Sequence, residues 1–169
     1  MNGRRARIVA SMVVLVLLAA ACSSNGNSGS SGSGGRLTKA QYIAQADKIC
    51  QTANQKTSAL GAPTSTDPQV LAKFLTKSGQ IISDAVNQLK KLQPPAADQQ
   101  KINQLVGGLE KSASYFPALI QAVKANDTQK IQQTAQQLQQ ASLQGQQIAQ
   151  TYGFHVCAHS ASTTASPTP

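Results

Sequence analysis

The chain has 169 residues, of which 12% are charged and 4% aromatic, and it contains no tryptophan. This length suits one domain with tails, and a core made from leucine, isoleucine, valine and alanine favours helices. The formal charge of +9 comes from lysines and arginines spread along the chain. A nucleic-acid-binding protein concentrates such residues in a stripe, so we expect a solvated basic surface and no nucleic-acid partner.

The amino end has the pattern of an export signal. Arg4, Arg5 and Arg7 precede an apolar stretch at residues 8–21, which is too short to span a bilayer as a helix. The run Leu-Ala-Ala-Ala before Cys22 resembles the lipobox of bacterial lipoproteins, although Ala19 stands where leucine is commonest. We therefore expect residues 1–21 to be a lipoprotein signal peptide and Cys22 to carry the lipid. The alternative is an ordinary cleaved signal followed by an incidental cysteine.

Two low-complexity segments flank the expected domain. Residues 22–36 begin with the lipidated cysteine and end with Arg36. Residues 23–35 between them are serine, glycine and asparagine, which bury nothing and should form a flexible tether. Residues 160–169 are serine, threonine, alanine and proline, and should be a disordered tail. The folded domain is therefore expected at residues 37–159.

Two helices are expected in the first half of this domain. Thr38 and Gln41 form a capping box, so a helix should start here and end near Gly61. Asp67 and Pro68 are typical of a helix N-cap and first position, and this second helix should stop at residues 94–95. The first has apolar residues at helical spacing, and the second has the richer apolar stripe.

Two further helices are expected in the second half. One should run over residues 95–125, with a kink at Pro117 and an unusual Gly107-Gly108 pair in its interior. Two readings of that pair are a close approach by a neighbouring helix and a gap for a ligand. Another helix should begin at Asp127 and run through Tyr152, with Gly153 as its left-handed C-cap. Its glutamine-rich sequence has a thin apolar face. Together the elements predict an all-α, up-down-up-down four-helix bundle.

The cysteine count predicts a disulfide. Once Cys22 is assigned to the lipid, Cys50 and Cys157 remain and can pair in an oxidising compartment. Such a bond would hold the thin-faced last helix to the bundle, and residues 154–157 would have to run extended to reach Cys50. Asp47, one turn before Cys50, should bond backbone amides of the segment that includes Phe154; a solvent-facing role is the alternative.

These motifs resemble a known group of proteins. The stretch from Leu37 to Cys50, the Leu-Gln-Pro-Pro-Ala run at 92–96 and the segment from Tyr152 to Cys157 together are similar to a widespread group of actinobacterial lipoproteins and small secreted proteins of unassigned activity. The resemblance implies a helical fold with a disulfide between the first helix and the carboxyl-terminal segment, in an extracytoplasmic location. It supplies no activity.

The mature chain offers little for catalysis. It has Glu110, five aspartates and two histidines, and it lacks paired Glu-x-x-His, Gly-x-Ser-x-Gly and phosphate-loop motifs. His155 and His159 flank Cys157 and would make a weak metal site if that thiol were free. We therefore expect that the protein is not an enzyme and that it has no cofactor and no metal site.

The leading hypothesis is a non-catalytic lipoprotein held on the extracytoplasmic face of the cell membrane through Cys22. Its bundle would bind an unknown envelope protein or a cell-wall component. The alternative is a carrier of a small molecule or lipid, with an apolar cavity near Gly107, Gly108 and Pro117 lined by Phe116 and Leu109.

Overall fold

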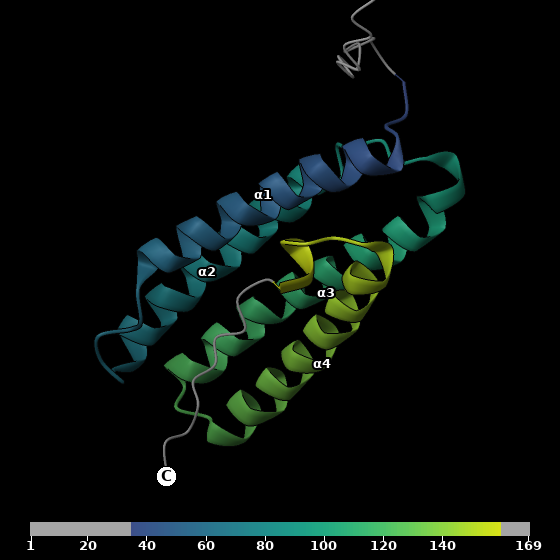
Figure 1. The fold of residues 1–169 in the computed structure, drawn as a ribbon. Helices are drawn as coiled ribbons and strands as arrows, with labels where there is room; N and C mark the ends of the chain where they lie inside the picture. Colours follow the sequence, from purple (N-terminus) through teal and green to yellow (C-terminus); the bar gives the residue numbers. More distant parts are fainter. Residues whose placement is uncertain (1–34, 160–169) are drawn as a thin grey trace, which may run out of the picture. The chain divides into compact units, whose positions relative to one another are not determined.

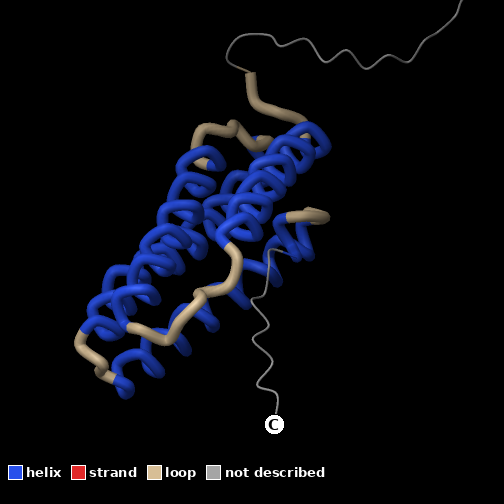
Figure 2. The backbone as a smooth tube through the Cα atoms, turned by 90° about the vertical axis from the view of Figure 1, so that its left-hand side faces the viewer, coloured by secondary structure: helices blue, strands red, loops and turns tan. Residues whose placement is uncertain are grey.

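The structure is a computed structural model that describes residues 35–159. The expected signal peptide (1–21), Cys22, the tether as far as residue 34 and the tail (160–169) lie outside the described residues. The described part is an all-α bundle of four long antiparallel helices, as expected, and Figure 2 shows helices and loops without a strand in this part. Two short 3-10 helices complete it, η1 (Ala96–Asp98) and η2 (Cys157–His159).

The first two helices start at the expected caps. α1 (Lys39–Leu60) begins after Thr38, whose hydroxyl accepts from the Gln41 amide while the Gln41 side chain accepts from the Thr38 amide. It ends at Gly61, which has a positive φ of 67°. α2 (Pro68–Leu89) begins after Asp67, and one oxygen of this aspartate accepts from the amides of residues 69 and 70. These side chains satisfy amides that the first helical turn leaves without partners.

The last two helices begin and end close to the expected residues. η1 forms the first turn after Pro95, and α3 (Gln99–Lys124) continues without interruption through the exposed Pro117. α4 (Thr128–Tyr152) is capped by Asp127 at its start and by Gly153 at its end, where φ is 103°. α2 ends at Leu89, a few residues before the prolines, and residues 90–92 form a turn.

The four helices do not share their contacts equally. The pair α3 and α4 has the most extensive contact, followed by α2 with α3 and then by α1 with α2. The backbones of α1 and α4 do not approach one another closely; the carboxyl-terminal segment around η2 lies between them (Figure 1). α1 is therefore the least embedded helix. The expectation that α4 loosens most without the disulfide stays a prediction, although the small residues of α4 allow a close approach to α3.

Small side chains explain the seam between α3 and α4. Ala141, Gly145 and Ala149 are buried along α4, and the Gly145 backbone faces Leu109 of α3. The larger apolar residues of α4 are only half-buried beside this seam. Close packing of short side chains substitutes here for burial of large ones.

The main core cluster lies at one end of the bundle. It combines the start of α1, the end of α2, the start of α3, the end of α4 and the segment after α4. Its fully buried members are Tyr42, Ala46, Val86, Leu89, Ile102, Leu105, Val106, Ala149, Tyr152, Phe154 and Ala158. The disulfide lies beside this cluster, so the best-packed region is also the cross-linked one.

Candidate functional site

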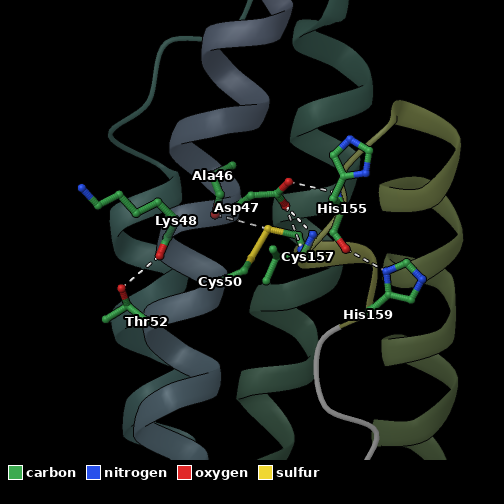
Figure 3. Close-up of a disulfide and its surroundings, with 9 residues drawn as sticks. Ala46, Asp47, Lys48, Cys50, Thr52, His155, Cys157 and His159 are labelled. Carbon is green, nitrogen blue, oxygen red and sulfur yellow. Dashed lines mark hydrogen bonds between the residues drawn. A yellow bond between two sulfur atoms is a disulfide. The ribbon is translucent and has the colours of Figure 1, made fainter.

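The disulfide joins the bundle where α1 and α4 do not meet. Cys50 of α1 and Cys157 of η2 are bonded with an S–S length of 2.02 Å and a Cα–Cα distance of 5.2 Å, across 107 positions of sequence. The expected pairing is confirmed (Figure 3). The approach of the segment is not as expected, because residues 154–157 bend and lead into η2 instead of running extended.

Asp47 fastens the same segment through its carboxylate. One oxygen accepts from the His155 amide at 2.9 Å, and the other accepts from the amides of Val156 and Cys157 at 2.9 Å each. The carboxylate therefore lies against the incoming backbone one turn from Cys50, as Figure 3 shows. The role expected for Asp47 is confirmed, and the solvent-facing alternative is wrong. We call Asp47, Cys50 and the segment 154–159 the C-terminal clamp.

Three aromatic rings pack together next to the clamp, and one of them, Phe154, belongs to its segment. The Tyr42 ring makes edge contacts with Tyr152 and Phe154, at centroid distances of 6.3 and 6.1 Å, and the latter two rings lie 5.1 Å apart. Gly153 makes the turn that brings Phe154 back onto this cluster, with a backbone conformation that L side chains rarely adopt. Phe154 belongs to the core cluster against which Cys157 packs, whereas the atom nearest to a Cβ on Gly153 would belong to Ile43.

Burial changes the acidity of two of these rings. It raises the pKa of Tyr42 to about 12. The pKa of Tyr152 also lies well above its ordinary value, first because of burial and then because its hydroxyl donates to Asp98 at 2.8 Å. Burial favours the neutral phenol because the phenolate loses its hydration, and the hydrogen bond favours it because a phenolate has no proton to donate to Asp98.

Polar contacts that the sequence did not reveal hold the same end of the bundle. The Asp98 carboxylate links η1 to the end of α4 through Tyr152, and the Lys39 ammonium lies 4.5 Å from the centre of the Tyr152 ring. The Arg36 guanidinium donates to the Pro94 carbonyl at 3.0 Å and to the Gln99 side chain. No motif around Asp98 in the sequence indicated that its carboxylate accepts a hydrogen bond from Tyr152.

Two hollows flank the Gly107-Gly108 pair. One has a volume of about 300 Å³ and lies between the end of α2 and α3, and the other has about 460 Å³ and lies between α3 and α4. Gly107 lines both. A Cβ on Gly107 or Gly108 would meet no atom within 4 Å, so close approach of a neighbouring helix does not explain these glycines.

The glycine that does permit close approach is Gly79 of α2. A Cβ there would lie 3.0 Å from the Phe116 ring. Phe116 thus packs on α2. The expected lining of a cavity beside Gly107 is wrong, because Phe116, Leu109 and Pro117 line neither of the two hollows.

The ionisable groups of the site are dispersed. Glu110 pairs with Lys90 at 2.6 Å on the surface, with both side chains about half exposed. His159 Nδ1 lies 2.7 Å from the His155 carbonyl oxygen, and the two imidazole rings do not point toward one another (Figure 3). Within residues 35–159 no group of three or more His, Cys, Asp or Glu side chains could hold a metal ion. With Cys157 oxidised, its thiolate is unavailable as a ligand.

Comparison of the chain with protein-family models, curated proteins and solved structures found no match. In the described part, no helix has the length and apolar character needed to cross a membrane. The site is therefore interpreted from its own chemistry: a carboxylate, a disulfide and buried rings that hold backbone in place.

Proposed function

We propose that this chain is a membrane-anchored envelope lipoprotein, held by lipid on Cys22 at the extracytoplasmic face, whose bundle is a non-catalytic binding module. The observation that carries the anchor is the pairing of Cys50 with Cys157. The sequence has three cysteines, so this bond leaves Cys22 as the one thiol for acylation. A bond of this kind also persists best in an oxidising compartment.

The surface of α4 supports the binding role. Residues 131–152 carry no charged side chain, and their solvent-facing positions are mostly glutamines around Leu143, which is 56% exposed. The larger hollow borders this surface through Gln144, Gln147 and Ile148. Amide side chains both donate and accept hydrogen bonds, so a neutral polar partner, such as a cell-wall glycan or an uncharged protein surface, fits this face.

The anchor is tested with Cys22→Ser in the full-length precursor. Wild-type protein should partition into the detergent phase, and the mass of its amino-terminal peptide should include a diacylglyceryl group and fatty acid. The Cys22→Ser protein should leave the membrane. A wild-type protein with an unmodified amino terminus would refute the anchor.

The binding module is tested by affinity capture of the intact lipoprotein from membranes, with Leu143→Lys and Gln144→Lys combined in one variant. The matched control carries Gln51→Lys and Gln55→Lys, which add the same charge to exposed positions of α1. Loss of a captured partner only with the α4 variant supports the proposal. Equal capture of the partner by both variants would show that the α4 face is not the binding surface.

A second candidate is a carrier of a small molecule, favoured by the hollows beside Gly107. Each glycine inside a helix costs about 1 kcal/mol relative to alanine, and no packing contact accounts for Gly107 or Gly108. Native mass spectrometry should then show a bound molecule that Gly108→Leu displaces. A ligand-free wild-type protein purified from membranes would count against the carrier.

A further inference from the structure

The chain enters the bundle at an end where three segments are strapped together. The Leu37 amide donates to the Gln93 carbonyl at 2.8 Å, and Arg36 bonds Pro94 and Gln99 of the α2–α3 connection. Tyr152, at the end of α4, joins through Asp98. Residues 35–39, 90–101 and 152–155 thus form one end of the bundle, which we call the entry end (Figure 1).

Charge is distributed unequally between the two ends. The entry end carries five exposed cations and one carboxylate, that of Asp98, which is already hydrogen-bonded to Tyr152. The cations are Arg36, Lys39, Lys90, Lys91 and Lys101. Even when Glu110 is counted against Lys90, and Asp47 is counted because it bonds the His155 amide, the entry end keeps a net charge of +2.

The opposite end is neutral. It consists of residues 58–70 and 124–130, where two carboxylates, Asp67 and Asp127, balance two cations, Lys124 and Lys130. Helix dipoles do not produce this difference, because each end of an antiparallel bundle contains two helix starts and two helix ends. The asymmetry is therefore one of side chains, brought together from separate segments by the fold.

We infer that the entry end docks onto anionic lipid headgroups of the membrane. This inference rests on the proposed lipid anchor, because the chain that follows Cys22 in sequence enters the bundle at this end, at Gly35. Clustered cations close to an anionic surface are attracted to it, by roughly fivefold in affinity per lysine or arginine. The docked bundle then presents α4 and its glutamine face sideways, with the opposite end directed away from the membrane.

Vesicle co-sedimentation tests the inference with the full mature chain carrying Cys22→Ser, so that no lipid contributes. Wild-type sequence in this background should bind phosphatidylcholine vesicles that contain phosphatidylglycerol and should not bind phosphatidylcholine alone. Raising the salt from about 0.1 M to 0.5 M should weaken binding strongly, because exposed charges are screened. Equal binding to both kinds of vesicle, or to neither, overturns the inference.

A pair of charge-matched variants separates location from net charge. Lys91→Glu with Lys101→Glu reverses two cations of the entry end, whereas Lys73→Glu with Lys77→Glu reverses two exposed cations in the far half of α2. The first should weaken binding about tenfold or more, and the second should change it much less. Equal loss in both would mean that overall charge alone attracts the protein, and the docking inference would fail. Because lipidation is measured separately by mass, either proposal can fail without the other.

Discussion

The two carboxylate oxygens of Asp47 accept three hydrogen bonds from residues 155–157, and replacing Asp47 with alanine removes all three bonds. The amides of Val156 and Cys157 are part-buried, whereas the His155 amide is exposed and water can replace its partner. A hydrogen bond to a charged group contributes about 1.5–3 kcal/mol, so the two part-buried bonds dominate. We expect Asp47→Ala to lower the free energy of unfolding by about 3–5 kcal/mol.

Urea unfolding of the oxidised protein, followed by circular dichroism, measures this loss. Asp47→Asn keeps one carbonyl oxygen for Val156 and Cys157 but turns an amide group toward His155, so its loss should be smaller, about 1–2 kcal/mol. Asp84→Ala is the matched control, since Asp84 is an exposed carboxylate on α2. Hydrogen exchange should increase at residues 155–157 in Asp47→Ala. A loss below about 0.5 kcal/mol, or an equal loss in Asp84→Ala, would refute the reasoning.

Three further outcomes follow from the packing and the pKa values. Cys50→Ser should reduce stability by about 4–5 kcal/mol, because the bond spans 107 positions, and hydrogen exchange should rise first in α1; uniform loss across all helices would contradict this. Gly79→Ala should destabilise the protein by about 1–3 kcal/mol through the clash with Phe116, while Gly107→Ala should stabilise it by about 0.5–1 kcal/mol; thermal melts that rank them the other way would contradict the packing argument. Because the folded-state pKa of Tyr42 lies above its unfolded value, stability should be full below pH 10 and fall by about 1.4 kcal/mol per pH unit toward pH 12. Alkaline urea titrations of Tyr42→Phe should show a shallower fall, and an unchanged slope would exclude this group.

Local chemistry explains what could be predicted from the sequence. Helix starts at Thr38, Asp67 and Asp127 depend on side chains that bond amides within three residues, so neighbours in sequence suffice. The disulfide followed from a count of cysteines. The role of Asp47 followed from its position one turn before Cys50, which any helix preserves.

Relationships between distant segments explain what could not be predicted. Gly107 and Gly108 have the same local signature as Gly79, and only the three-dimensional arrangement shows that Gly79 faces Phe116 while the others face open space. The lysines appear evenly spaced in sequence, yet folding gathers Lys39, Lys91 and Lys101 at the entry end. Neither fact is encoded in a short window of residues.

The C-terminal clamp also has a consequence for the order in which the molecule can be completed. Synthesis proceeds from the amino end, so α1 emerges first, yet both of its main fasteners wait for residues 155–157. Helices α2, α3 and α4 can associate through neighbouring contacts before that point, since each follows the previous one in the chain. In a nascent chain, α1 therefore lacks both the Asp47 hydrogen bonds and the disulfide until residues 155–157 have been synthesised.

Premature termination before Cys157 removes this bond. A chain that ends at Val156 retains Cys50 without the partner that it has in the folded bundle. Two such chains can cross-link through their Cys50 thiols in an oxidising compartment. The cysteine that pairs with Cys157 in the folded bundle thus marks chains that lack Cys157, which should appear as disulfide-linked dimers on a non-reducing gel.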